Sequence, residues 1–211
     1  MTAMTEEDAR AWVRDRFGVP RETLLARFVD ILLAEAEQQN LISRSTFDSV
    51  WARHIVDSAQ LLPLAQGADA MGTWLDIGTG AGLPGMVVAL ASDWHVAMVE
   101  PRKRRAAFLA ETAESLGIAS RVSVHASRIE SYRMRAPAAV ITARAVAELS
   151  ALLSSARHCA DLSTLWLLPK GRGAQSEVEA ARGAWQGSFH VESSITQPDS
   201  RIIVAREVRP R

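Results

Sequence analysis

Apolar side chains in the first 65 residues recur at intervals of three and four, the spacing of one face of an α-helix. Thr5 and Asp8 resemble a capping box that opens a first helix, which is expected to end at Phe17 before Gly18 and Pro20. Two more helices are predicted from apolar positions of the same spacing: Leu24, Leu25, Phe28, Ile31, Leu32 and Ala36, then Phe47, Val50, Trp51, Ile55, Ala59 and Leu62. We therefore expect an N-terminal helical appendage over residues 1–65.

From residue 66 onward the apolar positions form short runs of strand length. The runs begin at Trp74 and continue with Val96–Glu100, Val122–Ala126, Ala138–Ala143, Thr164–Leu168, Phe189–Thr196 and Arg201–Val208. Helical patterns in the first four intervals between them predict a doubly wound sheet. A turn at 197–200 separates the last two runs, which should pair as an antiparallel hairpin. The prediction for residues 66–211 is an α/β fold with a mostly parallel seven-stranded sheet.

Composition and charge restrict the function less than the pattern does. The chain has 211 residues, of which 48% are hydrophobic, enough for a full core, and its formal net charge is zero. A nucleic-acid partner would therefore need a local basic surface. The acidic start and the lack of any long apolar run predict a cytoplasmic protein, and the single cysteine, Cys159, permits no internal disulfide. The histidines lack metal-ligand spacing, so no metal site is expected.

The segment from Trp74 to Gly85 carries the strongest chemical signal in the chain. A strand containing Asp76 is followed by glycines at alternate positions, Gly78, Gly80 and Gly82, and then by an apolar helix. Glycine allows a sharp turn and a close approach of the main chain to a ligand. This arrangement predicts a nucleotide-type site at the carboxyl end of the first strand, with Asp76, Gly78 and Gly80 among the binding residues.

Two cofactor classes compete for this loop. Residues 80–85 match G-x-G-x-x-G, the dinucleotide pattern. However, Asp76 and Gly78 precede that match, and a carboxylate there would repel a pyrophosphate while it would tolerate or attract a cationic sulfonium. The loop therefore favours S-adenosylmethionine over NAD.

Glu100 ends the second predicted strand and is placed to accept both ribose hydroxyls of an adenosine. The alternative is that its carboxylate caps the following helix. That helix begins with four successive cations, residues 102–105, which either contact an anionic partner or form a solvated surface.

Five motifs follow one another along the chain, after two in the N-terminal helices, and the resemblance that they carry covers nearly the whole chain. They are Asp76–Gly85, Glu100–Leu109, Ser127–Glu130, Thr142–Ala145 and Pro169–Gly171, with Asn40–Ser43 and Arg53–Ser58 before them. In these motifs the chain resembles the bacterial ribosomal RNA small-subunit methyltransferase G family, also called glucose-inhibited division protein B. Family members more often have Leu where this chain has Pro169, so the main-chain path before Lys170 is open.

The resemblance implies a Rossmann-like class I methyltransferase that transfers a methyl group from S-adenosylmethionine to N7 of a guanine in the decoding-region loop of 16S ribosomal RNA. It implies that Gly78 and Leu83 line the methionine part of the cofactor and that Ile129 and Glu130 meet the adenine. Arg144 would lie beside both the cofactor and the RNA entrance. The substrate would be 16S ribosomal RNA or an assembling small subunit, and the enzyme would be a monomer.

Guanine N7 has a free lone pair and no proton to lose, so no acid–base residue is assigned and positioning is expected to dominate. Arg128, Arg144 and Lys170 follow successive strands and are predicted to hold RNA phosphates, with Arg144 and Lys170 also positioning the substrate. The alternative for each is an exposed cation with a local carboxylate partner. His54 and Asp57 lie one helical turn apart and either face the cleft or form a surface pair.

Two other functions stay open on the sequence alone. A small-molecule methyltransferase would share the cofactor loop, but its N-terminal helices would close a dry apolar pocket. A nicotinamide oxidoreductase would need a Tyr or His beside the site, and Tyr132, the only tyrosine, has no Lys partner at the usual spacing.

Overall fold

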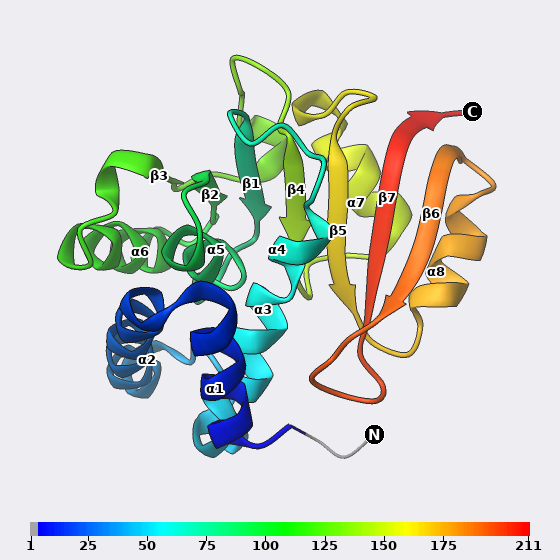
Figure 1. Cartoon of the computed structure of the whole chain (residues 1–211). Coiled ribbons are helices and arrows are strands. Elements are labelled where there is room, and N and C mark those ends of the chain that lie inside the picture. The colour runs from blue at the N-terminus through cyan, green and yellow to red at the C-terminus, as the bar shows by residue number, and fades with distance from the viewer. Residues whose placement is uncertain (1–3) are drawn as a thin grey trace.

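Seven strands form one sheet in the order β3-β2-β1-β4-β5-β7-β6 (Figure 1). The computed structural model describes residues 4–211. The strands are β1 (Thr73–Ile77), β2 (His95–Val99), β3 (Val122–His125), β4 (Val140–Ala143), β5 (Leu165–Lys170), β6 (Trp185–Ser193) and β7 (Arg201–Pro210). The first five strands pair in parallel, whereas β7 is antiparallel to both β5 and β6. The predicted seven-stranded α/β sheet with its C-terminal hairpin is confirmed.

Helices cover both faces of the sheet because alternate strand residues are apolar on both sides. Trp74 of β1 belongs to the hydrophobic cluster that contains α5 (Gly85–Ala91) and α6 (Lys103–Ser115). Its neighbour Leu75 belongs to the cluster on the other face, with α7 (Leu149–Ala156) and α8 (Ala174–Ala181). The sheet reverses its strand order between β1 and β4, and ligands of open α/β sheets bind at such a point, beyond the carboxyl ends of the strands.

The N-terminal helices pack against the same face as α5 and α6. α1 (Glu6–Phe17) begins after Thr5, whose hydroxyl oxygen accepts the amide of Asp8, and α2 (Val19–Gln39) follows Gly18. Both helices contribute buried residues to the cluster that contains α5. Figure 1 shows them on the side of the molecule toward which β1, β4 and β5 point. The predicted boundary at residue 65, between the N-terminal helical appendage and the domain that contains the sheet, stays a prediction.

The third predicted helix is not one regular α-helix. It consists of a 3-10 helix η1 (Arg44–Ser49), a π-helix η2 (Trp51–Val56), and short α3 (Asp57–Ala59) and α4 (Leu61–Leu64). The carboxylate of Glu6 accepts the amides of Trp51 and Ala52, both at 2.9 Å, so these two amides are bonded outside a helical ladder. Because this contact joins residues far apart in the sequence, the helical spacing of the apolar positions predicted one regular α-helix where the chain forms several short helices.

One of the four connections predicted to be helical differs from the prediction. Between β3 and β4 the described chain has only the 3-10 turn η4 (Ile129–Ser131), because this interval is short and ends in Pro137. Single 3-10 turns also occur at η3 (Ala119–Arg121) and η5 (Arg157–Cys159). β5 continues through Pro169 because pairing with β4 ends at Leu167, so Pro169 lies where one side of β5 has no strand partner.

No helix within residues 4–211 combines the length and apolar character needed to cross a lipid bilayer.

Candidate active site

The glycine loop between β1 and α5 adopts the conformation that its sequence predicts. Gly78 and Gly80 have φ angles of 64° and 55°, in the left-handed region that side chains resist. The amide of Gly78 donates to the carbonyl of Val99 at 2.8 Å, which ties the loop to the end of β2. The amide of Gly80 donates to Oε2 of Glu100 at 2.9 Å. The loop is thus held against the second strand at two points.

Asp76 lies fully buried beneath this loop. Its Oδ2 accepts the amide of Gly85 at 2.9 Å and its Oδ1 accepts the hydroxyl of Thr142 at 2.8 Å. Burial raises the pKa of Asp76 to about 6, although these hydrogen bonds and the charge of Arg144 act in the opposite direction. The structure therefore gives Asp76 a loop-holding position behind the site. Direct contact with a cofactor stays a prediction.

Glu100 has contacts that fit both of its predicted roles. Besides Gly80, its carboxylate accepts the amide of Arg102 at 2.9 Å through Oε1, and Arg102 occupies the N-cap position of α6. Glu100 is 4% exposed, so the capping interaction is made in a buried setting. Each carboxylate oxygen can accept a second hydrogen bond, so ribose hydroxyls remain compatible with this geometry.

A cavity of about 220 Å³ opens beside the loop, with mostly apolar walls. Its walls are Ile77, Gly78, Val99, Pro101, Arg128, Ile129, Glu130 and Val146. The residues predicted to meet the adenine, Ile129 and Glu130, therefore lie in the same cavity as Gly78. Nearby, the hydroxyl of Ser127 is buried and has no hydrogen-bond partner within residues 4–211. We refer to this space as the small cavity.

A second, more polar cavity of about 680 Å³ lies next to it and is called the large cavity here. Its charged and titratable lining residues are Arg53, His54, Asp57, Arg144, Glu148, Lys170, Glu177 and Arg201. The large cavity is thus formed by η2, the segment after β4, the end of β5 and the start of β7.

Arg144 is held by His54 and Asp57, which answers the question that the sequence left open for this pair. Both terminal nitrogens of Arg144 lie 3.4 Å from Nδ1 of His54, and Nη1 lies 3.4 Å from Oδ2 of Asp57. Burial, together with the nearby charges of Arg144 and Arg53, lowers the pKa of His54 to about 3. The imidazole is therefore neutral at physiological pH.

The tautomer of His54 follows from its neighbours. Its Nε2 lies 2.9 Å from the hydroxyl of Thr46, which donates its own proton to the carbonyl of Ser43 at 2.7 Å. Nε2 consequently carries the proton, and the lone pair of Nδ1 faces the Arg144 guanidinium. His54 and Asp57 thus orient Arg144 and do not form a surface pair.

Lys170 is not a free cation. Its Nζ lies 2.6 Å from the carbonyl of Ala147 and 2.7 Å from the Glu177 carboxylate, and its side chain is 11% exposed. The same Glu177 oxygen accepts the amide of Leu149 at 2.8 Å. Lys170 and Glu177 therefore fasten the start of α7 and the segment before it. Lys170 was predicted either to hold an RNA phosphate or to be an exposed cation with a local carboxylate partner. It has the carboxylate partner, but it is not exposed.

The remaining predicted residues differ in exposure. Arg128 is exposed and lines the small cavity only. Leu83 is buried in the hydrophobic core, so its contact with the methionine portion stays a prediction. In the cationic run, Arg105 donates to the carbonyl of Asn40 at 3.3 Å, and Arg104 lies 3.9 Å from Glu35. These two cations contact α2 and the residue that ends it.

The family model of rRNA small subunit methyltransferase G (GidB) matches residues 21–203. The chain belongs to this family. It is 50% identical over 212 residues to the ribosomal RNA small subunit methyltransferase G of Rhizorhabdus wittichii, covering 99% of this chain and 96% of that protein. The corresponding protein of Zymomonas mobilis is 44% identical, with 99% and 96% covered. The resemblance stated from the motifs is thereby confirmed.

Solved structures with a similar fold are methyltransferases of low sequence identity. A SAM-dependent methyltransferase from Aquifex aeolicus aligns with a TM-score of 0.59 at 15% identity, covering 82% of this chain and 97% of that one. The glycopeptide N-methyltransferase MtfA, in complex with sinefungin, aligns with a TM-score of 0.59 at 10% identity, covering 72% and 93%. These similarities confirm the methyltransferase type of the fold.

Several residues at or behind the two cavities were not predicted from the sequence. Arg53 lies within a quoted motif but was not singled out, and Val146 directly follows another. Glu177 gave no local signal, and Thr142 was part of a motif without an assigned role, because their partners Lys170 and Asp76 become neighbours only in the folded chain. Within residues 4–211 no group of three or more His, Cys, Asp or Glu side chains is arranged to hold a metal ion.

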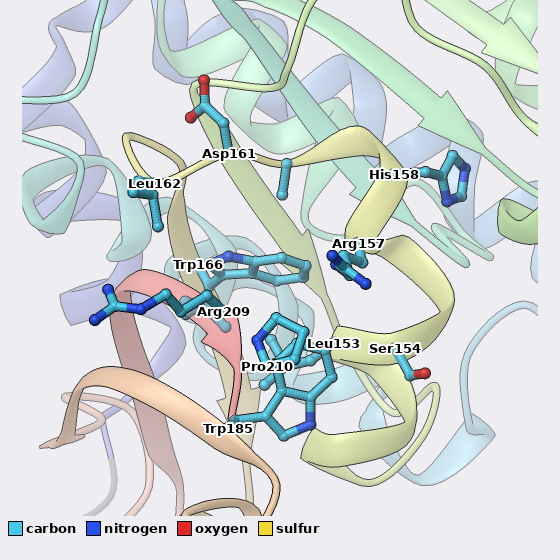
Figure 2. A pocket seen from close by; sticks show the side chains of 12 residues that line it. Leu153, Ser154, Arg157, His158, Asp161, Leu162, Trp166, Trp185, Arg209 and Pro210 are labelled. Carbon is cyan, nitrogen blue, oxygen red and sulfur yellow. The ribbon is translucent and has the colours of Figure 1, made fainter.

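Another hollow, of about 640 Å³, lies near the amino end of β5, away from the strand ends that form the site (Figure 2). Figure 2 shows Trp166, Trp185 and Pro210 at its centre and Arg157 beside them. None of the predicted site residues lines it. It supplies useful control positions for experiments on the site.

Proposed function

We propose that this chain methylates N7 of a guanine in the decoding-region loop of 16S ribosomal RNA, with S-adenosylmethionine as the methyl donor. One observation carries the proposal: a mostly apolar small cavity beside the glycine loop adjoins a large, charged cavity at the same edge of the sheet. A cofactor and a polar macromolecular substrate need such neighbouring sites. Membership of the family supports the reaction class.

The residues of the small cavity fit the adenosine part of this cofactor. Val99, Ile129 and Pro101 offer apolar surface to a planar base, as nucleoside sites require. Glu130 can accept from an exocyclic amine, and the partnerless Ser127 hydroxyl supplies a further polar group. Glu100 would hold the ribose, while Gly78, Gly80 and Leu83 would hold the methionine portion. Arg144 would lie beside its reactive end.

The chemistry needs no base from the protein. When bound, the cofactor would supply an electrophilic methyl group to the N7 lone pair, and the electrons of its carbon–sulfur bond would stay with sulfur. The guanine then carries a positive charge. The protein's task is to align N7 with the methyl group. A neutral His54 suits this task, because an imidazolium would repel the Arg144 guanidinium that it orients.

The large cavity supports an RNA substrate over a small molecule. A small-molecule site closed by the N-terminal helices was expected to be dry and apolar, whereas this cavity is lined by Arg53, Arg144 and Arg201. Guanidinium groups are suited to RNA phosphates. Arg128 would add a phosphate contact at the neighbouring rim, while Lys170 would act by holding the loop before α7.

A nicotinamide enzyme is not supported by the position of Tyr132. Its ring packs against that of His125 at 4.6 Å between centroids, and it lines neither cavity. A ribosomal RNA substrate and a single free cysteine, Cys159, fit action in the cytoplasm.

A strain that lacks this chain provides the test. Its 16S ribosomal RNA should have lost N7-methylation at one guanine of the decoding-region loop, and the intact chain should restore it. The Gly80→Val variant should not, because valine resists the left-handed conformation at that position. Arg157→Ala, in the remote hollow, is the matched control and should restore methylation. An unchanged methylation pattern in the deletion strain would overturn the proposal.

A further inference from the structure

Val146 occupies the boundary between the two cavities. Of the residues that the structure describes, it alone lines both the small and the large cavity. Its side chain is apolar, yet Val146 is 44% exposed, in contrast to the buried apolar residues that form the core. A single exposed apolar residue is common on protein surfaces, so what distinguishes Val146 is its place between the two cavities.

The main chain places Val146 there at a conformational cost. Ala145, the preceding residue, has a φ angle of 56°, in the left-handed region that alanine seldom adopts. Such strain persists only where surrounding contacts impose it, and it is concentrated at functional sites.

Contacts on both sides of Val146 impose this conformation. On the N-terminal side, Arg144 is held by His54 and Asp57. On the C-terminal side, the carbonyl of Ala147 accepts from Lys170 at 2.6 Å, and Lys170 is held by Glu177. The segment between these two attachments has little freedom, so Val146 is presented in a fixed position.

Val146 also covers the glycine loop. A Cβ atom added to Gly78 would come within 2.7 Å of Cγ2 of Val146, so the valine lies directly against that glycine. One part of the side chain therefore closes the small cavity, and the remaining part faces the large cavity.

We propose that Val146 is a substrate-contact residue that holds the target base in line with the methyl donor. The proposal rests on the proposed function and assigns a specific contact within it. The branched side chain would lie against the flat apolar surface of the guanine and limit the positions that N7 can take. The arginines of the large cavity suit phosphates, whereas the branched apolar side chain of Val146 suits the face of a base, next to the smaller apolar residues Ala145 and Ala147.

Two variants and a control test this assignment in the full chain with small ribosomal subunits as substrate. Val146→Ala removes the branched contact, and Val146→Thr keeps its shape. Leu162→Ala, at an exposed apolar residue of the remote hollow, is the matched control. Three quantities are measured: the affinity for S-adenosylmethionine by calorimetry, the dependence of the transfer rate on the concentration of subunits, and the single-turnover rate of methyl transfer at saturation.

For Val146→Ala the transfer rate at saturation should fall about tenfold or more, because misplacement of reacting atoms acts on the chemical step. Affinities for cofactor and subunits should stay within about threefold, since neither depends mainly on this contact. Val146→Thr should retain most of the rate, and Leu162→Ala should match the parent. These results would support the proposal.

The proposal is overturned if Val146→Ala transfers methyl groups at the parental rate, or if its defect lies wholly in cofactor affinity. It is also overturned if Val146→Thr is as slow as Val146→Ala, since the contact is assigned to the branched shape. Failure of the proposed function looks different. In that case the parental chain itself transfers no methyl group to 16S ribosomal RNA, although it binds the cofactor.

Discussion

The amide of Gly80 donates to the carboxylate of Glu100 at 2.9 Å, across twenty residues of sequence. This bond joins the glycine loop after β1 to the end of β2, and the second oxygen of Glu100 accepts the amide of Arg102 at the start of α6. One buried carboxylate thus fixes the shape of the loop and caps a helix. Any ribose contact of Glu100 would be added to these two bonds.

Glu100→Gln should therefore reduce both cofactor affinity and stability. The amide group has only one acceptor oxygen, so one of the two main-chain amides loses its partner, at a cost of about 1 to 3 kcal/mol in the free energy of unfolding. Cofactor affinity should weaken by about 1 to 3 kcal/mol as well, the usual loss for a charge-assisted hydrogen bond. Calorimetry and urea unfolding measure the two effects.

The control for Glu100→Gln is Glu111→Gln, at an exposed position of α6, which should change neither quantity. Loss of stability with parental cofactor affinity would show that Glu100 acts as a cap without touching the ribose.

Gly85→Ala should destabilise the fold through Asp76. A Cβ on Gly85 would lie 2.8 Å from Oδ2 and 3.0 Å from Cβ of Asp76, a fully buried residue with no room to move. Such overpacking costs about 1 to 3 kcal/mol. At Gly171 an added Cβ has no neighbour within 4 Å, so Gly171→Ala is the control and should stay close to the parental stability. Equal midpoints of chemical unfolding for the two variants would contradict the placement of Asp76.

His54 should make the protein lose stability in acid. Its pKa is about 3 in the folded chain and about 6.5 when unfolded, so the unfolded state binds the extra proton first. The stability contribution is complete above pH 6.5 and is lost as the pH falls toward 3, which amounts to about 2 kcal/mol at pH 5. Asp76, whose pKa is raised, acts in the opposite direction between about pH 4 and 6.

The contribution of His54 is isolated by comparing the parent with His54→Gln from pH 7 to 4. The difference in the free energy of unfolding between them should change by about 2 kcal/mol between pH 7 and pH 5. The control is His95→Gln, at an exposed position, whose difference from the parent should not change in this way. A pH-independent difference for His54→Gln would mean that the imidazole is not held neutral.

Salt dependence should separate the cations that touch RNA from those that hold the protein together. Arg128→Ala should flatten the slope of log affinity against log salt by roughly one unit, because one phosphate contact is lost. Lys170→Ala should keep the parental slope while lowering activity, since its ammonium is bound to Ala147 and Glu177. Arg144→Ala should weaken both cofactor and RNA binding.

Arg157→Ala is the control for the salt experiment, because Arg157 is exposed at the remote hollow. A flattened slope for Lys170→Ala equal to that of Arg128→Ala would show that Lys170 leaves Glu177 to bind a phosphate.

Local sequence signals were sufficient for the sheet and the loop. Buried parallel strands such as 96–100 appear as continuous apolar runs, and the turn at 197–200 identifies the hairpin without any tertiary information. The glycine loop is an equally local signal, because the left-handed φ angles of Gly78 and Gly80 favour glycine at those positions.

Features that depend on distant partners could not be predicted in this way. Glu6 alters the helix at Trp51 from 45 residues away, and Arg144 reaches His54 across 90 residues. The partner of Lys170 lies on α8, beyond the strand that carries it. Charge and spacing showed that these groups were present, but only the fold determined which of them are free to meet a substrate.

The central claim is tested most directly by incubating the purified chain with small ribosomal subunits from a strain that lacks it, using S-adenosylmethionine with a labelled methyl group. The labelled guanine is then located by chemical cleavage at N7-methylguanine. The account predicts one labelled position, in the decoding-region loop of 16S ribosomal RNA, and no label with Gly80→Val. Label on another atom or another RNA, or no transfer by a chain that binds the cofactor, would contradict it.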